Sequence, residues 1–218
     1  MKSVDLISKN IPSLLPSDTG SFAIKLMNEY HVTHLPVVHD HHLIGLISEE
    51  DILNIHAEEA PVESLQFSLV KTFIRDHEHP LEVMRAMAQL RLTLIPVIDQ
   101  HENYLGAITR ESLLNYFNTD TDVLEHGGVL LIEGALKDFS LAEVVRIIES
   151  DQVKILALFS RTLEDKLSIT IKVNQSDLQP IIADLNRFGY EVKESFAEPE
   201  YFSSLKDRYE SLMNYLNI

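Results

Sequence analysis

The chain has 218 residues, 45% of them hydrophobic and 24% charged, as is typical of a folded globular protein. It contains no cysteine, which excludes disulfides, thiolate zinc sites and a cysteine nucleophile. The formal net charge of −16 disfavours binding to nucleic acid and to anionic membranes, because both are negatively charged. We see no secretory signal and no apolar run long enough for a membrane span, so we expect a cytoplasmic protein.

The first half begins with a polar turn followed by a helical pattern. Apolar residues at positions 23, 26, 27 and 30 have the spacing of one helix face. The apolar runs Leu35 to Val38 and Leu43 to Ile47 predict two strands joined by a polar turn. Ser48 then begins another helix, and Ser48 with Asp51 fits a capping box. With a short leading strand, this unit is predicted to have the order β-α-β-β-α.

The same pattern recurs about 60 residues later in the chain. Leu35-Pro36-Val37-Val38 is matched by Ile95-Pro96-Val97-Ile98, an offset of 60. Gly45-Leu46-Ile47-Ser48 is matched by Gly106-Ala107-Ile108-Thr109, an offset of 61, so the second turn should be one residue longer. We therefore predict two repeats, at residues 1–60 and 61–117, that bury their sheet faces against each other.

The start of the helix in each repeat carries residues that suit a phosphorylated ligand. A helix N-terminus offers free amides and a positive dipole end, and the hydroxyl of Ser48 or Thr109 adds a donor. The Asp51 carboxylate is able to accept hydrogen bonds from a ribose diol, whereas Ser112 stands at this position in the second copy. Gly45 allows close approach of the backbone.

This doubled motif resembles the CBS domain family over roughly residues 8–118. The resemblance rests on the two proline-containing strands and on the two segments that run from glycine to the helix cap. It implies a non-catalytic sensor whose repeats form two clefts for AMP, ADP, ATP or another adenosyl ligand. It also implies a homodimer that regulates a target enzyme or transporter, with no required cofactor.

The residues and the resemblance together predict which residues contact the ligand. They are Ser48, Asp51, Gly45, Thr109, His34, Pro36, Thr19 and Arg110. Because only the first copy has a carboxylate, we expect at most one competent cleft, the one that contains Asp51. Arg110 is the best candidate cation. We expect AMP to fit this acidic chain better than ATP, because AMP carries less charge.

The second half predicts a separate α+β domain after a polar linker at 118–128. The pattern indicates strands at 129–132, 153–159, 167–173 and 190–196, and helices at 139–148 and 176–188. Ser140 and Ser176 are the predicted helix caps, and Gly189 the predicted C-cap. The order β-α-β-β-α-β is ferredoxin-like.

Residues 129–197 resemble an ACT domain in the first strand, the turn at Ser140 and the segment after the first helix. This resemblance implies amino-acid binding or dimer formation. We favour dimer formation, because Ser140 stands where the family carries glycine. Residues 198–218 predict a C-terminal helix with one apolar face. The combination of both domains resembles bacterial acetoin-utilisation accessory proteins.

Two alternatives stay open. One is a structural assembly protein whose clefts are empty, as Ser112 and the acidic surface suggest. The other is an enzyme, and only the histidine-rich segments His39 to His42 and His77 to His79 favour it. Neighbouring side chains on an extended chain point to opposite faces, so we expect no metal site there. We also expect no catalytic residues, because no nucleophile elbow or phosphate-binding glycine loop is present.

Overall fold

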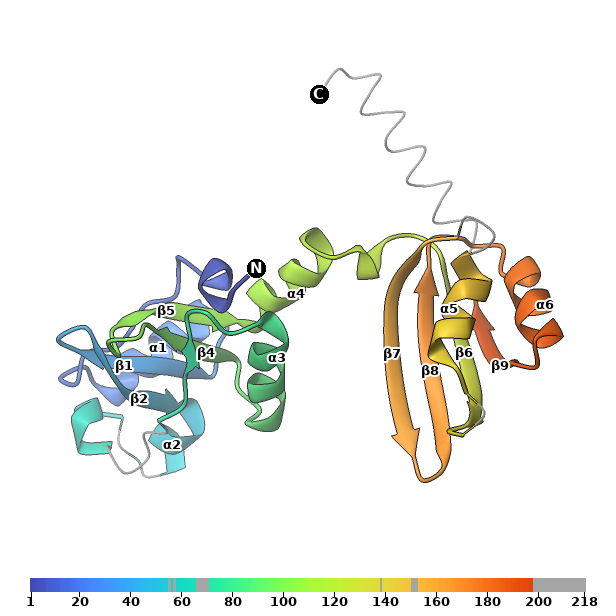
Figure 1. Cartoon of the computed structure of the whole chain (residues 1–218). Coiled ribbons are helices and arrows are strands. Elements are labelled where there is room, and N and C mark those ends of the chain that lie inside the picture. Colours follow the sequence, from blue (N-terminus) through green and yellow to red (C-terminus); the bar gives the residue numbers. More distant parts are fainter. Residues whose placement is uncertain (55, 57, 66–70, 138, 150–152, 198–218) are drawn as a thin grey trace, which may run out of the picture. The chain divides into compact units, whose positions relative to one another are not determined.

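The computed structural model describes residues 1–218 except 55, 57, 66–70, 138, 150–152 and 198–218 (Figure 1). The chain divides into two compact units, Met1–Tyr116 and Phe117–Ile218, and each has a mixed α/β fold. The predicted C-terminal helix at 198–218 lies outside the described residues.

The first unit contains the two predicted repeats. Its elements, with η for a 3-10 helix, are η1 (Ser3–Leu6), α1 (Gly20–Glu29), β1 (His34–His39), β2 (His42–Ser48), α2 (Glu49–Asn54), η2 (Val62–Leu65), β3 (Ile74–Arg75), α3 (Pro80–Gln89), β4 (Leu94–Ile98), β5 (Tyr104–Thr109) and α4 (Arg110–Thr119). The leading strand of repeat 1 is a single parallel bridge between Leu14 and Val37. In repeat 2 it is the two-residue strand β3, parallel to β4. The predicted β-α-β-β-α order is therefore confirmed.

The two hairpins have equivalent registers. Each is antiparallel, with Val37 opposite Gly45 in the first and Val97 opposite Gly106 in the second, and each register shifts directly afterwards. The first turn is the two-residue pair at positions 40–41, where both φ angles are positive, as a tight type I′ hairpin requires. The second turn is held by the Asp99 carboxylate, which accepts the amides of residues 101 and 103 at 2.8 Å. The predicted difference in turn length is confirmed.

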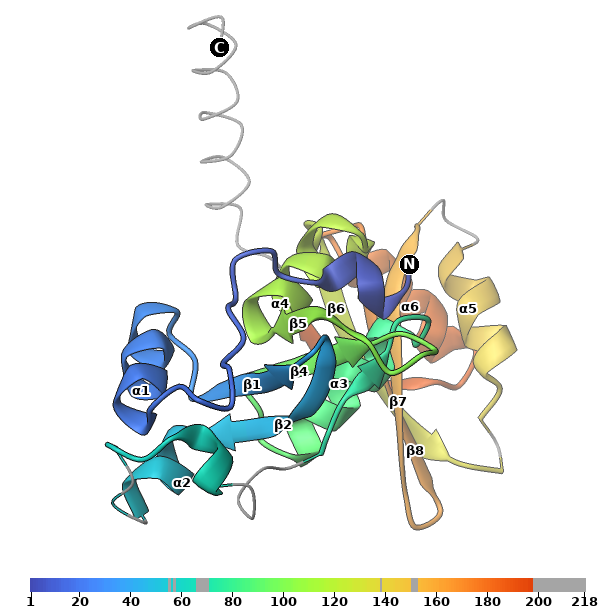
Figure 2. The same ribbon diagram turned by 90° about the vertical axis from the view of Figure 1, so that its left-hand side faces the viewer.

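The helices of the first unit pack as their periodicity predicts. Ala23 and Met27 of α1 are buried, and so are Val83 and Met87 of α3. The helices α1 and α2 lie side by side in Figure 2. After α1 and after α3 the chain turns through a left-handed residue at position 31 and position 91, each with φ +54°. The offset of 60 therefore extends to the backbone at the helix ends.

The second unit is a four-stranded antiparallel sheet with two helices. Its elements are η3 (Asp122–Leu124), β6 (Gly128–Ala135), α5 (Leu141–Glu149), β7 (Ile155–Leu163), β8 (Lys166–Val173), α6 (Gln179–Arg187) and β9 (Glu191–Phe196). The strand order is β7-β8-β6-β9. The helices α5 and α6 contact each other on one face of the sheet, over a core of Leu, Ile and Val side chains (Figure 1). The ferredoxin-like order is confirmed.

Most of the predicted helix ends of the second unit agree with the structure, and one does not. The Ser140 hydroxyl accepts the Glu143 amide at 3.3 Å, and Gly189 follows α6 with φ +87°, so both predicted caps are confirmed. The prediction that Ser176 caps the next helix is wrong, because α6 begins at Gln179, directly before Pro180. Proline has no amide hydrogen and is therefore best accommodated in the first helical turn.

The predicted linker at 118–128 contains regular structure. It includes the end of α4 and the short helix η3, and β6 begins at Gly128. The side chain of Asp122 in η3 binds Lys154 at 2.5 Å, within the second unit. This segment is therefore attached to the sheet domain by a contact that its polar composition did not indicate.

Gly127 is predicted to be essential for the second unit. Its φ is +148°, and a Cβ at this position would lie 1.8 Å from the Val173 carbonyl oxygen. Gly127→Ala should therefore destabilise the protein by about 3 kcal/mol or more, from strain and overpacking together. Gly189→Ala is the matched control, since its φ is also positive but nothing lies within 4 Å. Its cost should be about 1–2 kcal/mol. Equal losses in urea unfolding would contradict this explanation.

Candidate functional site

The start of α2 is built from a reciprocal pair of hydrogen bonds between Ser48 and Asp51. The Ser48 hydroxyl accepts the Asp51 amide at 3.1 Å and donates to Asp51 Oδ2 at 2.5 Å. The Ser48 amide donates to the same oxygen at 3.3 Å. The predicted capping box is therefore confirmed. Because both bonds to the carboxylate use Oδ2, its other oxygen is left for another donor.

The start of α4 repeats this geometry without a carboxylate. Thr109 Oγ1 accepts the Ser112 amide at 3.1 Å, and the two hydroxyls lie 3.1 Å apart. Thr109 is buried at the end of β5. This helix start therefore offers hydroxyls and the positive end of a helix dipole, which suit an anion. It has no counterpart to the charge of Asp51.

The two helix starts are held by one polar cluster made of Thr33, Thr93 and His34. The Thr33 amide donates to Thr93 Oγ1 at 3.0 Å. His34 Nδ1 lies 3.0 Å from Thr33 Oγ1 and 3.2 Å from Thr93 Oγ1. The carbonyls of the two threonines accept the first amides of α2 and α4, at 3.0 and 3.2 Å. The cluster therefore joins the corresponding turns of both repeats.

The electrostatic surroundings of His34 come from both repeats. Burial holds the pKa of His34 below its ordinary value of 6.5, the Asp51 carboxylate opposes this shift, and the Arg110 charge adds to it. Leu94, at the equivalent position of repeat 2, is fully buried. His34 is therefore the one member of this symmetric pair that is able to respond to charge at either helix start.

The guanidinium group of Arg110 is held by two carbonyls in the segment that follows α3. Its Nε donates to the Leu92 carbonyl at 2.8 Å, and its Nη2 donates to the Arg91 carbonyl at 3.2 Å. A guanidinium group has five N–H donors, so three are left for a ligand. The bonds to the two carbonyls position the cation beside the helix start at Thr109.

A cavity of about 380 Å³ lies at this helix start, between the two repeats. Four separate parts of the chain line it, and their residues are Ser8, Asn10, Ile11, Tyr30, His31, Val32, Thr93, Thr109, Arg110 and Glu111. The first segment is held against β5, because the Ser8 amide donates to the Ala107 carbonyl at 2.9 Å. Two of the residues predicted to bind a ligand, Thr109 and Arg110, are therefore brought together here.

The remaining predicted ligand residues lie elsewhere. Pro36 and Gly45 are buried within the β1–β2 hairpin. Thr19 is the N-cap of α1, where its hydroxyl accepts the Phe22 amide at 3.2 Å. In repeat 2 the segment Ser8–Ile11 lies beside the helix start. With the offset of 60, the segment beside Asp51 should be residues 68–71, but residues 66–70 lie outside the described part of the chain. The structure thus describes the cavity at Thr109, whereas the sequence favoured the cleft at Asp51.

A family comparison agrees with the repeat and with this geometry. Residues 3–58 and 71–119 match the family model described as CBS domain. The first unit is a tandem pair of CBS domains. The two matched ranges contain both helix starts, both hairpins and all the residues that line the cavity.

Individual relatives match about half of this chain. A homoserine O-acetyltransferase from Methanococcus vannielii is 28% identical over 118 residues, which are 51% of this chain and 24% of that protein. A CBS domain pair/ACT domain protein from Thermotoga maritima has 19% identity and a TM-score of 0.48, over 55% of this chain and 98% of that one. CBSX2 from Arabidopsis thaliana, in complex with AMP, has 22% identity and a TM-score of 0.47, over 55% and 97%. The chain spans about a quarter of the length of the acetyltransferase.

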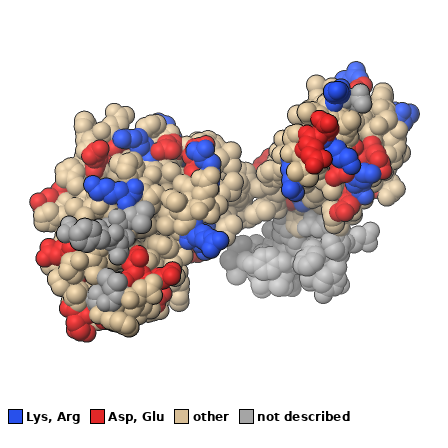
Figure 3. All heavy atoms as spheres, turned by 90° about the horizontal axis from the view of Figure 1, so that it is seen from below, with Lys and Arg blue, Asp and Glu red and all other residues tan. Residues whose placement is uncertain are grey.

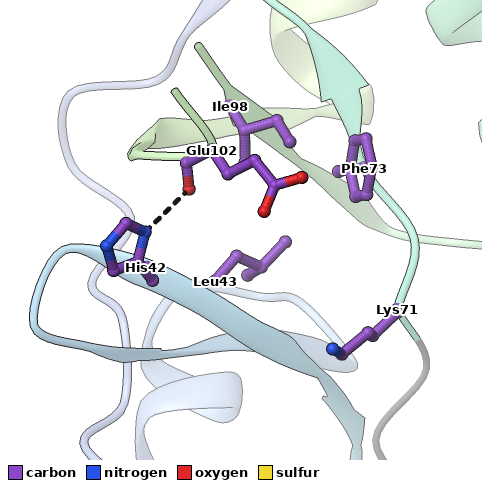
Figure 4. A pocket seen from close by; sticks show the side chains of 6 residues that line it. All are labelled: His42, Leu43, Lys71, Phe73, Ile98 and Glu102. Atoms are coloured by element: carbon purple, nitrogen blue, oxygen red, sulfur yellow. Dashed lines mark hydrogen bonds between the residues drawn. The ribbon is translucent and has the colours of Figure 1, made fainter. Parts of the chain in front are cut away.

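A second cavity, of about 310 Å³, lies where the two hairpin turns of the CBS pair meet (Figure 4). Its lining residues are His42, Leu43, Lys71, Phe73, Ile98 and Glu102. His42 Nδ1 lies 3.3 Å from the Glu102 carbonyl, and the Arg75 guanidinium lies 5.8 Å from the centre of the Phe73 ring. Sequence reasoning missed Lys71 and Phe73, and also Tyr30, His31 and Asn10 of the first cavity. The repeat offset could have identified Tyr30 and His31. Residues 30–32 directly precede Thr33, just as residues 90–92 directly precede Thr93 in the second repeat.

The surface charges of the described residues are mixed. On the face seen in Figure 3, acidic and basic side chains are interspersed, and the drawn Lys and Arg do not form a continuous patch. Within the described ranges, no group of three or more His, Asp or Glu side chains is arranged to hold a metal ion. In the same part of the chain, no helix is both long and apolar enough to cross a membrane.

His34 should make the stability of the CBS pair depend on pH. Its pKa is lowered in the folded state, so below pH 6.5 the unfolded chain binds more protons than the folded chain. The free energy of unfolding should therefore fall as the pH drops through 6.5 towards the folded pKa. The variant His34→Leu copies Leu94 of repeat 2. In urea titrations, its free energy of unfolding should fall less between pH 7.5 and 5.5 than that of the wild type. A variant with the same pH slope as the wild type would show that His34 titrates normally.

Proposed function

We propose that this chain is a non-catalytic regulatory protein that binds an adenine nucleotide between its two CBS repeats. The observation that carries the proposal is the cavity of about 380 Å³ at the start of α4. Small-molecule sites generally have volumes of about 300–1,000 Å³ and combine apolar walls with a few convergent polar groups. Ile11, Tyr30 and Val32 supply apolar surface for a base, and Thr93 and Thr109 supply hydroxyls.

The phosphate is proposed to bind at the start of α4. This helix has ten residues, and the positive end of its dipole lies beside Arg110. The amides of Arg110 and Ser112 already bind the Thr93 carbonyl and the Thr109 hydroxyl, so the attraction comes mainly from the dipole and the guanidinium group. However, Glu111 also lines the cavity, and the whole chain carries a net charge of −16. Each additional phosphate would increase the repulsion. AMP is therefore proposed as the preferred ligand, ahead of ADP and ATP.

Asp51 is proposed to bind ribose in the second, symmetry-related cleft, together with Ser48. The free carboxylate oxygen of Asp51 supports this role. The charges of Asp51 and Arg110 also both affect the pKa of His34, in opposite directions. Charge placed at either helix start would act on His34, which offers a route by which one cleft affects the other. The regulated target is proposed to be an enzyme or a transporter.

The second unit is proposed to be an ACT-like domain that builds a homodimer. Its ferredoxin-like strand order supports this assignment. Amino-acid binding at the first strand–helix turn is not favoured, because the Ser140 hydroxyl already caps α5. The turn is also crowded, since a Cβ on Gly134 would lie 2.9 Å from the Phe139 ring.

A structural protein with empty clefts is the alternative that a specific observation favours. Ser48 and Asp51 bind each other, and Arg110 binds two carbonyls, so these groups have partners without a ligand. On this alternative, the CBS pair and the second unit serve only to assemble a homodimer. Native mass spectrometry of the purified full chain distinguishes the two, because only a sensor retains or takes up a nucleotide.

Thermal unfolding with AMP, ADP, ATP and S-adenosylmethionine tests the proposed function. A ligand at about 100 times its dissociation constant stabilises the folded state by about 2.7 kcal/mol. AMP should therefore raise the melting temperature measurably, and more than ATP at equal concentration. Thr109→Val, which removes one hydroxyl at constant shape, should weaken AMP binding about tenfold, as the loss of a hydrogen bond to a charged group predicts.

Paired variants of α2 identify the cleft. Asp51→Asn keeps the size of the side chain but removes the charge, and Glu50→Gln removes the same charge from an exposed position of the same helix. If the second cleft binds ribose, only Asp51→Asn should reduce the nucleotide-induced shift. If no nucleotide shifts the wild type at millimolar concentration, the structural alternative replaces the proposed function.

A further inference from the structure

The cavity where the two hairpin turns meet is separate from the cavity at the start of α4. The two cavities share no lining residue. The volume at the hairpin turns is about 310 Å³, which is at the lower end of the range that is usual for small-molecule sites. This cavity therefore suits a compact ligand, and binding there does not depend on the nucleotide function proposed above.

Backbone contacts between the two hairpins fix the wall of this cavity. The Tyr104 amide donates to the His41 carbonyl at 2.7 Å, and His42 forms an antiparallel bridge with Asn103. The second turn is also held from within by the Asp99 carboxylate. The side chains at this junction therefore project from a preformed frame, which reduces the entropy cost of binding a ligand.

Part of the cavity surface is apolar. Ile98 is buried, Leu43 is half-buried, and the ring of Phe73 lies at one side of the cavity (Figure 4). The Arg75 guanidinium lies 5.8 Å from the centre of this ring, and such a cation–π contact holds the ring in place. These three side chains offer a surface on which the apolar part of a ligand is removed from water.

Two opposite charges reach the same cavity from different segments (Figure 4). Lys71 comes from the segment before β3, and Glu102 comes from the turn between β4 and β5. Within the described part of the chain, neither side chain has an ion-pair partner. Glu102 has φ +64°, a left-handed conformation that is uncommon for residues other than glycine and asparagine. A cation and an anion that are not paired with each other, beside an apolar surface, are complementary to a zwitterion.

The repeat shows that the chemistry of this cavity belongs to one side of the CBS pair. The registers of the two hairpins place Leu43 and Tyr104 at equivalent positions. The Tyr104 hydroxyl is buried and has no hydrogen-bond partner among the described residues, so the larger ring takes up buried space on its side. By the offset of 60, Ile11 corresponds to Lys71, so the cation is not repeated either.

We propose that the cavity at the hairpin turns binds a free α-amino acid with an apolar side chain. The ligand carboxylate pairs with the Lys71 ammonium, and the ligand ammonium pairs with the Glu102 carboxylate. The ligand side chain packs on Leu43, Phe73 and Ile98. A nucleotide is disfavoured at this place, because the Glu102 carboxylate repels phosphate and Lys71 is the single lysine or arginine among the described lining residues.

Isothermal titration calorimetry on the full chain tests the ligand class, with L-leucine as the probe. L-leucine should give a saturable heat. Isocaproate lacks the ammonium group and isoamylamine lacks the carboxylate, so each should bind at least about tenfold more weakly, as the loss of a hydrogen bond between charged groups predicts. If L-leucine, L-methionine and L-phenylalanine all give no heat at millimolar concentration, the proposal is wrong. Equal affinities for L-leucine and both analogues would also overturn it.

Variants locate the binding site. Lys71→Met and Glu102→Gln change exposed side chains, so both should fold normally, and each should weaken L-leucine binding at least about tenfold. Leu43→Tyr introduces the residue of the second repeat and should abolish binding by filling the cavity. Lys25→Met and Glu63→Gln remove the same charges from other exposed positions of the CBS pair and should leave the affinity unchanged. Equal affinities in Glu102→Gln and Glu63→Gln would overturn the placement of the amino acid in this cavity.

Discussion

The bond between Thr33 and Thr93 is the contact on which the arrangement of the first unit depends. Each threonine precedes a central strand, and each threonine carbonyl accepts the first amide of the helix that ends its own repeat. Because the Thr33 amide also binds the Thr93 hydroxyl, the two helix starts are held beside each other. A site that uses both repeats is therefore a consequence of their packing, and His34 lies in the polar cluster that joins the two turns.

Charge limits what this site is able to bind. The cavity at the start of α4 has one cation, Arg110, and one carboxylate, Glu111, within a chain of net charge −16. The helix dipole and the hydroxyls contribute attraction without adding formal charge. Such a site suits an anion of low charge. It differs from the equivalent position at Asp51, where a carboxylate replaces the Ser112 hydroxyl, so the two helix starts of the CBS pair are chemically unequal.

The second unit depends on a different constraint, the alternation of side chains along β6 and β8. One set of positions packs against α5 and α6, and the other set lies on the opposite face of the sheet. On the side of the helices, the ring of Phe139 makes an edge-to-face contact with Tyr190, with 5.3 Å between the ring centroids.

The sequence by itself determined the features that depend on local periodicity and on repetition. The offset between Pro36 and Pro96 predicted two equivalent hairpins, and the spacing of Ser48 and Asp51 predicted a cap, because both are encoded by neighbours along the chain. The placement of Ser176 failed because the conformational restriction of Pro180 prevailed over a favourable capping residue. Only the tertiary structure decided that Ser8, Tyr30 and Thr109 line one cavity, because periodicity describes which face a residue occupies and not which distant segment packs against it.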